Sequence, residues 1–179
     1  MTVPTEQSIA DLIASRLRDI PDFPQPGVVF KDYTPLIADG PAFAAVVRDI
    51  AGRYAGTIDV VAGIEARGFI MAAAVAYELG VGMVPIRKAG KLPGETLSEA
   101  YSLEYGTAEI EVHSDAFEPG LRVLVLDDVL ATGGTAAAAC ELVERTGAVV
   151  SGVDVLLELS FLNGRSRLTG RPVHAMLTV

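Results

Sequence analysis

The sequence has little cysteine and histidine, and this shortage excludes several kinds of site. Cys140 is the single cysteine, so an intramolecular disulfide and a multi-cysteine metal centre are both excluded. The two histidines, His113 and His174, lie in strand-like segments with no metal-ligand residues nearby in the sequence. We therefore expect no metal site built from protein ligands alone.

Positive charge and long apolar runs are also scarce. Fourteen Lys and Arg residues stand against 23 Asp and Glu, giving a net charge of -9, which disfavours a nucleic-acid-binding surface. No apolar run approaches the length of a membrane span, and the N-terminus lacks the charged-then-apolar order of a signal peptide. We therefore expect a cytoplasmic protein without nucleic-acid or membrane partners. Its 179 residues suit a single domain, 1–179.

What the sequence does contain is an alternation of helix and strand patterns. Apolar spacing predicts a helix over residues 9–20 that stops at Pro21, and a second helix over 43–54. The segment between them, 21–35, is too rich in proline for regular structure. Further along, the pattern predicts strands at 58–64, 81–88, 122–127, 149–157 and 172–179, and helices at 69–79 and 134–145. The predicted class is α/β, with a mostly parallel central sheet flanked by helices.

The segment 88–106 departs from this alternation. Gly90, Pro93 and Gly94 interrupt it, and the alternation that follows at Ala108 and Ile110 predicts a hairpin. We expect the segment to act as a lid that closes over bound substrates and excludes water.

The stretch VLVLDDVLATGGT, residues 123–135, carries the most specific chemistry. Asp127 and Asp128 end an apolar strand, and ligands bind beyond such strand ends in parallel sheets. Backbone amides freed by two glycines, with the dipole of the following helix, suit a phosphate group. The loop matches neither G-x-G-x-x-G nor G-x-x-x-x-G-K-[ST]. A tight turn with a solvated Asp pair remains the alternative for this loop taken alone.

The whole stretch resembles the signature loop of the type I phosphoribosyltransferases, which bind 5-phosphoribosyl-1-pyrophosphate (PRPP). The resemblance implies that Asp127 and Asp128 accept hydrogen bonds from the ribose hydroxyls. It also implies that the loop holds the 5′-phosphate through Ala131, Thr132, Gly133, Gly134 and Thr135. Four other segments resemble the adenine-specific members of the family: DFPQPGVVFKD (22–32), GIEARGF (63–69), IRKAGKLPG (86–94) and YSLEYG (101–106).

The resemblance further assigns a catalytic pair and contacts to the base. Glu104 is implied to exchange a proton with adenine N7, and Arg67 to act beside the pyrophosphate. A small N-terminal hood is implied to bind the base, with backbone groups around Val28 facing the purine edge. Leu159 is a candidate apolar wall for the base, although a core position is the preferred interpretation of that leucine. The remaining implied substrate contacts are Lys31, Arg87, Lys88, Lys91 and Tyr105.

Several of these assignments keep an alternative. Arg87 and Lys88 are adjacent in a strand and must point to opposite faces. They form either a solvated basic rim or substrate contacts, one of which serves the neighbouring subunit of a homodimer. Glu99, Glu109 and Glu111 are interpreted as solvated carboxylates of the lid. The family often has a cis peptide at the position of Glu65–Ala66. Ala66 stands where serine is common, and Lys31 where arginine is common.

The resemblance implies the reaction of adenine with PRPP to give AMP and pyrophosphate, a purine-salvage step. Mg²⁺ is the expected cofactor, held mainly by PRPP, pyrophosphate and water. Two alternatives remain. One is a phosphoribosyltransferase for another purine base, and the other is a PRPP-sensing regulator that catalyses nothing.

Overall fold

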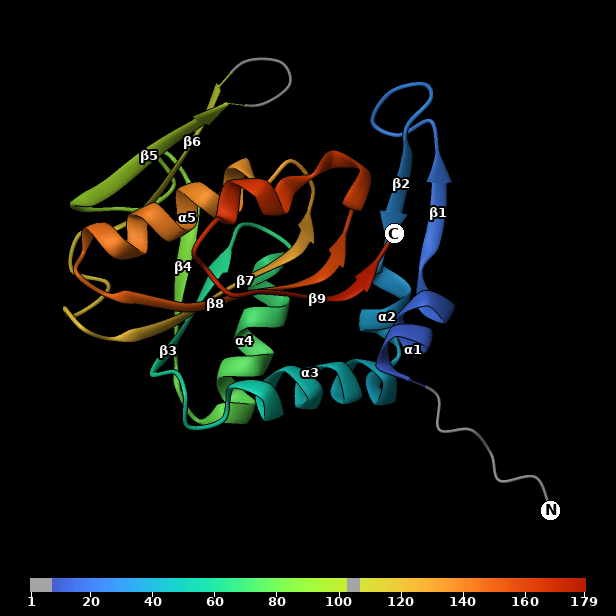
Figure 1. Cartoon of the computed structure of the whole chain (residues 1–179), viewed down its shortest axis with the longest axis horizontal. Helices are drawn as coiled ribbons and strands as arrows, with labels where there is room; N and C mark the ends of the chain where they lie inside the picture. The colour runs from blue at the N-terminus through green and yellow to red at the C-terminus, as the bar shows by residue number, and fades with distance from the viewer. Residues whose placement is uncertain (1–7, 103–106) are drawn as a thin grey trace. The chain divides into compact units, whose positions relative to one another are not determined.

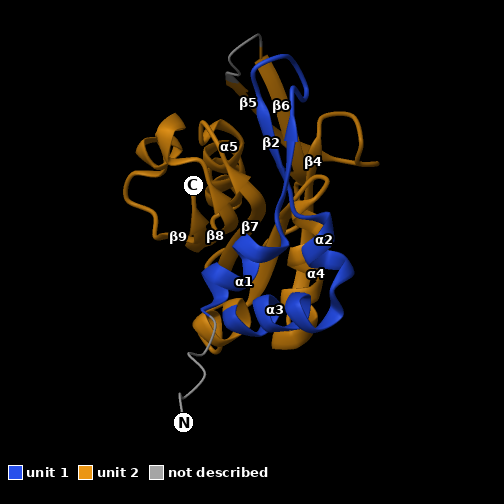
Figure 2. Ribbon diagram, turned by 90° about the vertical axis from the view of Figure 1, so that its right-hand side faces the viewer, with its two compact units in different colours: residues 1–49 blue, residues 50–179 orange. Residues whose placement is uncertain are grey.

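The computed structural model describes residues 8–102 and 107–179, which fall into two compact units (Figure 2). Unit 1 is Met1–Asp49 and unit 2 is Ile50–Val179. The boundary lies within one helix, α3 (Gly40–Tyr54). In the described ranges, no helix combines the length and the apolar character needed to cross a membrane.

Unit 1 begins with a helix that is shorter than predicted. Helix α1 (Ile9–Arg16) starts at Ser8, whose side chain accepts a hydrogen bond from the amide of Asp11. The chain then turns extended, and β1 (Arg18–Pro21) pairs antiparallel with β2 (Val29–Asp32). The prediction of a helix to residue 20 was therefore wrong. Ion pairs between the two strands, Arg18–Asp32 and Lys31–Asp19, favour the strand pairing over helix continuation.

The proline-rich segment also has more regular structure than predicted. It contains β2, and its last residues begin α2 (Thr34–Ala38). Pro35 lies in the first turn of α2, where proline has no intrahelical hydrogen bond to lose. The prediction of irregular structure over 21–35 was wrong at this end. Helix α3 confirms the second predicted helix.

Unit 2 is built on a seven-stranded sheet in the order β5-β6-β4-β3-β7-β8-β9 (Figure 1). The strands from β4 to β9 in this order are parallel, while β5 and β6 form an antiparallel hairpin at one edge, as predicted. The strands are β3 (Val60–Ile64), β4 (Gly82–Lys88), β5 (Thr96–Ser102), β6 (Thr107–His113), β7 (Arg122–Leu130), β8 (Val149–Glu158) and β9 (Val173–Thr178). The helices are α4 (Gly68–Leu79), α5 (Gly134–Arg145) and the short η1 (Ser160–Leu162) and η2 (Gly164–Leu168).

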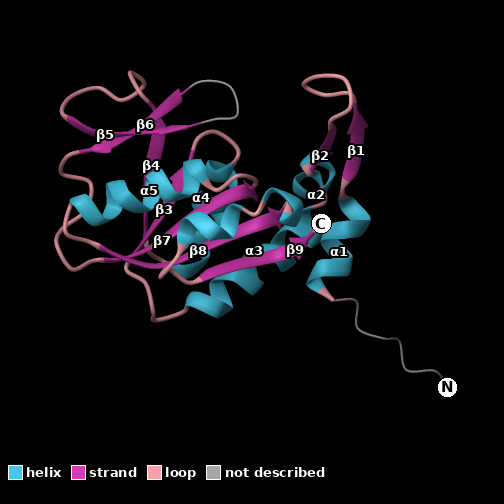
Figure 3. Ribbon diagram, turned by 45° about the horizontal axis from the view of Figure 1, so that its top comes forward, coloured by secondary structure: helices cyan, strands magenta, loops and turns pink. Residues whose placement is uncertain are grey.

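Helices α4 and α5 cover opposite faces of this sheet (Figures 1 and 3). Alternate side chains of β7 point to opposite faces of the sheet. Val123 and Val125 belong to the apolar cluster that includes residues of α5, so they point to the α5 face. On the α4 side, a Cβ at Gly63 would lie 2.6 Å from the Cβ of Ala72, so the helix packs directly on the β3 backbone there. The predicted α/β class is confirmed.

The connections fix where a ligand can bind. In the order of the sheet, β3 and β7 are neighbours. After β3 the chain continues to β4, on the far side of β3 from β7, whereas after β7 it continues to β8, on the far side of β7 from β3. The carboxyl ends of β3 and β7 therefore flank a topological switch point, which is the usual ligand crevice of such sheets.

Candidate active site

The loop between β7 and α5 forms a small hollow that is open to solvent. Gly133 caps α5 with a φ of 79°, a left-handed conformation that favours glycine. The amides of the first helical turn have no partner within the helix, so this end of α5 suits an anion. The hollow is lined by Asp127, Val129, Leu130, Ala131, Thr132, Gly133, Gly134, Thr135 and Ala136. All five predicted phosphate-loop residues are among them.

Asp127 and Asp128, near the carboxyl end of β7, differ in their surroundings. Asp128 is 6% exposed, and its Oδ2 lies 2.6 Å from Nε of Arg67, which comes from the β3–α4 turn. Asp127 is only partly buried, and its Oδ1 accepts a hydrogen bond of 2.8 Å from the amide of Asp128. The structure thus joins the predicted catalytic arginine to one member of the predicted acidic pair.

Asp127 is the residue whose ionisation the site perturbs most clearly. Desolvation raises the pKa of Asp127 well above its ordinary value, and the nearby charge of Asp128 adds to this, while Arg67 opposes it. Helix α4 starts directly against the same side chain. A Cβ on Gly68 would lie 2.9 Å from Asp127 Oδ1. A ligand that brings hydroxyl donors or a cation would relieve this crowded negative charge.

The turn after β3 holds a second set of predicted residues. The Glu65–Ala66 peptide is cis, as the sequence resemblance implied. Glu65 Oε2 accepts from Nε of Arg87 at 3.0 Å and from the amide of Lys88 at 3.1 Å. Burial alone would raise the pKa of Glu65, but these donors lower it overall. Arg87 is therefore paired within its own chain, while the Lys88 and Lys91 residues are exposed.

Glu111 corrects the prediction of a solvated carboxylate. It is 5% exposed, and its Oε1 accepts 2.8 Å hydrogen bonds from the amides of Lys91 and Leu92. The amide of Leu92 is the main cause that lowers the pKa of Glu111, and burial opposes it. The carbonyl of Lys91 in turn accepts from Arg87 at 3.0 Å. The error arises because the loop after β4 covers this position of β6, opposite Arg87, and donates two amides to the side chain, which alternation along the strand does not predict.

The predicted base contacts Val28 and Lys31 belong to unit 1. The amide of Val28 donates to the carbonyl of Gln25, and its carbonyl accepts from Phe23, both at 3.2 Å. Both backbone groups that we expected at the purine edge are thus used inside the β1–β2 loop. Lys31 Nζ lies 2.8 Å from Asp19 across the same hairpin.

Three other predicted residues remain. Glu104 and Tyr105 lie outside the described residues. Leu159 is half-buried at the start of η1, so it is not one of the fully buried core residues. Its amide donates to the carbonyl of Leu130 at 2.9 Å, next to the phosphate loop.

Comparison with known proteins decides the family. Residues 36–158 match the phosphoribosyl transferase domain. An adenine phosphoribosyltransferase of Salinispora tropica is 64% identical over 172 residues, covering 95% of this chain and 91% of the relative. This chain belongs to the adenine phosphoribosyltransferase family.

Solved structures of the family share this fold. The adenine phosphoribosyltransferase of Thermoanaerobacter pseudethanolicus superposes with a TM-score of 0.90 at 48% identity, covering 93% of this chain and 98% of that one. The enzyme from Trypanosoma brucei was solved in complex with AMP, pyrophosphate and ribose-5-phosphate. It superposes with a TM-score of 0.89 at 26% identity, covering 99% of this chain and 82% of that one.

Sequence reasoning missed residues that contact the predicted site residues or their loops and hold them in place. Glu65 could have been found, because an acid beside the predicted Arg67 turn is an obvious partner for a neighbouring cation. Glu111 gave no such signal, because its partners lie in a loop about 20 residues earlier in the chain. Gly164 gave no signal of its own, yet it packs against the phosphate loop.

Proposed function

We propose that this protein transfers the phosphoribosyl group of PRPP to adenine, giving AMP and pyrophosphate. The observation that carries the proposal is the hollow at the start of α5, with Asp127 on its wall and the Arg67–Asp128 pair beside it. The carboxyl ends of β3 and β7 thus offer a phosphate-binding loop, acceptors for the hydroxyls of a sugar diol, and a cation. Membership of the family supplies the reaction, and the bound AMP and pyrophosphate of the Trypanosoma brucei enzyme support it.

The chain's residues would act on PRPP as follows. The amides at the start of α5 and the hydroxyls of Thr132 and Thr135 bind the 5′-phosphate. The carboxylates of Asp127 and Asp128 accept hydrogen bonds from the 2′- and 3′-hydroxyls. Arg67 is placed to neutralise charge as pyrophosphate leaves with the electron pair of the C1′–O bond.

Adenine N9 would attack C1′ as that bond breaks, through an oxocarbenium-like ribose. The proton of the base must leave, and we propose that Glu104 accepts it through N7. Backbone groups around Val28 would read the 6-amino group and N1 of the base. Since those groups are hydrogen-bonded inside their own loop, the loop must open for adenine to use them.

Mg²⁺ would support the departure of pyrophosphate by neutralising its oxygens. Among the described residues, no group of three or more His, Cys, Asp and Glu could hold a metal ion. The chain does offer the partly desolvated carboxylates of Asp127 and Asp128, whose mutual repulsion a nearby cation would relieve. These residues fit an ion that PRPP and water hold for the most part.

The test is turnover of the purified protein with PRPP, Mg²⁺ and each purine base. We expect kcat/KM for adenine to exceed that for hypoxanthine or guanine by about a hundredfold or more, because a mismatched polar edge leaves buried groups unpaired. Equal use of guanine would overturn the base assignment. Binding of PRPP without turnover of any base would instead favour a sensing regulator.

We also propose that the protein acts in the cytoplasm as a homodimer. Helix α4 supports the dimer, because it carries the apolar side chains of Ile70 and Tyr77 at 42% and 88% exposure, two helical turns apart. Sedimentation equilibrium at micromolar concentration should give twice the chain mass, and a monomer mass would refute the dimer.

A further inference from the structure

The outer side of the phosphate loop rests on the backbone of η2. A Cβ placed on Gly133 would lie 2.2 Å from the carbonyl oxygen of Gly164. A Cβ placed on Gly164 would lie 2.2 Å from the carbonyl oxygen of Ala131 and 2.9 Å from the amide nitrogen of Gly133. Real Cβ atoms do not come this close to backbone atoms. The two segments are therefore in direct backbone contact, and a shift of one must move the other.

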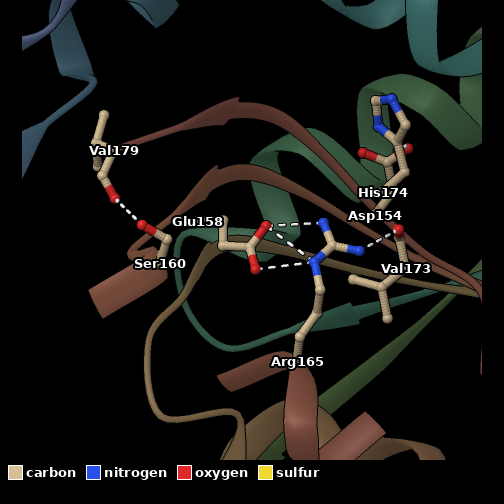
Figure 4. A network of polar contacts seen from close by, with 7 residues as sticks. All are labelled: Asp154, Glu158, Ser160, Arg165, Val173, His174 and Val179. Carbon is tan, nitrogen blue, oxygen red and sulfur yellow. Dashed lines mark hydrogen bonds and ion pairs between the residues drawn. The ribbon is translucent and has the colours of Figure 1, made fainter. Parts of the chain in front are cut away.

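The residue after Gly164 is fixed by an ion pair (Figure 4). Arg165 donates through Nε and Nη2 to the carboxylate of Glu158, at 2.9 and 2.7 Å, and through Nη1 to the carbonyl of Val173 at 2.7 Å. Glu158 is only 7% exposed and ends β8. One guanidinium thus ties the start of η2 to the ends of two strands, and a forked pair of this kind fixes orientation as well as distance.

We propose that Arg165, held by Glu158, is a positioning residue for the phosphate loop. It keeps Gly164 against Ala131 and Gly133, so that the amides at the start of α5 are already aimed at the 5′-phosphate before PRPP arrives. Arg165 acts through Gly164 and does not touch substrate. The inference rests on the proposed function, because it assigns PRPP to this loop.

A second forked ion pair in unit 2 serves as a control that separates positioning from general stability. Arg122 makes the same kind of fork to Asp59, with Nη2–Oδ1 at 2.7 Å and Nε–Oδ2 at 3.0 Å, and also donates to the carbonyl of Gly56. Both arginine side chains are 45% exposed. Arg122 begins β7, at the opposite end of the strand from the phosphate loop.

The experiment compares Arg165→Met, Arg165→Lys and Gly164→Ala with wild type and with the control Arg122→Met. Three quantities are measured for each: the Kd for PRPP with Mg²⁺ by calorimetry, kcat and KM with adenine, and the thermal midpoint. We expect Arg165→Met to weaken PRPP binding by about ten- to a hundredfold, since small misplacements of a binding group have effects of this size. The KM for PRPP should rise in parallel, with a smaller change in kcat.

The other variants sharpen the outcome. Arg165→Lys keeps the charge without the fork and should recover part of the PRPP affinity. Gly164→Ala leaves the ion pair intact but displaces the backbone contact, so it should weaken PRPP binding as well, and it keeps the test open if Arg165→Met does not fold. Arg122→Met should also lower the thermal midpoint, by less than Arg165→Met because Asp59 is more exposed than Glu158, and should leave the Kd for PRPP unchanged.

Two results would overturn the inference while the proposed function stands. One is a PRPP Kd that is equal in wild type, Arg165→Met and Gly164→Ala. The other is an equal loss of affinity in Arg122→Met and Arg165→Met, which would make the effect one of stability. A wild-type protein that neither binds PRPP nor transfers it would overturn the proposed function itself, before any variant is compared.

Discussion

Replacing Asp127 by Asn should stabilise the free protein and impair its use of PRPP. Asn has the same shape and keeps Oδ1 as acceptor for the amide of Asp128, so the contact with Gly68 is preserved. Only the charge is lost. In the free protein this charge is unfavourable, because desolvation and Asp128 raise the pKa of Asp127.

The raised pKa of Asp127 determines how the free energy of unfolding depends on pH. An acid whose pKa is raised by folding binds more protons in the folded state between the unfolded and folded pKa values, so the free energy of unfolding falls as pH rises through that window. The full cost is present above the folded pKa and absent below the unfolded pKa. Asp127→Asn should therefore be the more stable protein at pH 7, by about 0.5–2 kcal/mol, the usual gain from a single stabilising substitution.

The same substitution should have the opposite effect on the use of PRPP, which it should weaken. A hydrogen bond to a charged acceptor contributes about 1.5–3 kcal/mol, against about 1 kcal/mol for a neutral one. Asn can still accept from one ribose hydroxyl, so kcat/KM for PRPP should fall by about tenfold or more. Stability would thus rise as function falls, which is typical of a site that stores unfavourable charge for its ligand.

Urea unfolding between pH 2 and pH 8 measures the first effect, and steady-state kinetics the second. Asp59→Asn is a control of opposite sign, because Arg122 lowers the pKa of Asp59 to about 2. That variant should be less stable than wild type at neutral pH, and the difference should vanish only as pH falls through about 2. The reasoning would be refuted if Asp127→Asn were the less stable protein at pH 7, or if its advantage grew toward acid pH.

Three further predictions concern Glu104, Glu111 and the segment after β4. Glu104→Leu should lower kcat by about 10²–10⁴, the usual range for a general acid–base group, with little change in PRPP affinity. Glu109→Leu is the control and should do little; similar small effects from both would remove Glu104 from the mechanism. Glu111→Gln should accelerate amide hydrogen exchange at Lys91 and Leu92, because the neutral amide is a weaker acceptor for both. In wild type, PRPP with an adenine analogue should slow exchange at residues 88–95, and unchanged exchange there would argue against a lid.

Local pattern was sufficient for most of unit 2. The all-apolar run at β3 predicts a strand buried on both faces, and the helix-ending glycine at Gly80 marks the end of α4. The phosphate loop was readable for a similar reason. Its glycines, threonines and acids are consecutive in the chain, so their spacing alone places them at one strand end.

Unit 1 shows where local pattern fails. The apolar spacing through residue 20 is helical, but Arg18 and Asp19 find partners 14 and 12 residues further on, at Asp32 and Lys31. Pairing between separate segments adds hydrogen bonds and ion pairs that no local periodicity records. The helix therefore yields to a strand.

The sequence by itself determined the class of the fold and the family, and it led to the proposal of the phosphate loop, since each depends on residues that are adjacent or regularly spaced. Tertiary structure alone decided how those residues are held. Arg67, which follows β3, meets Asp128 on the neighbouring β7, Glu111 binds a loop 20 residues before it, and Gly164 contacts residues 31 and 33 positions before it. Such contacts depend on the distance between backbones in space, and that distance is set only when the sheet order brings the strand ends together.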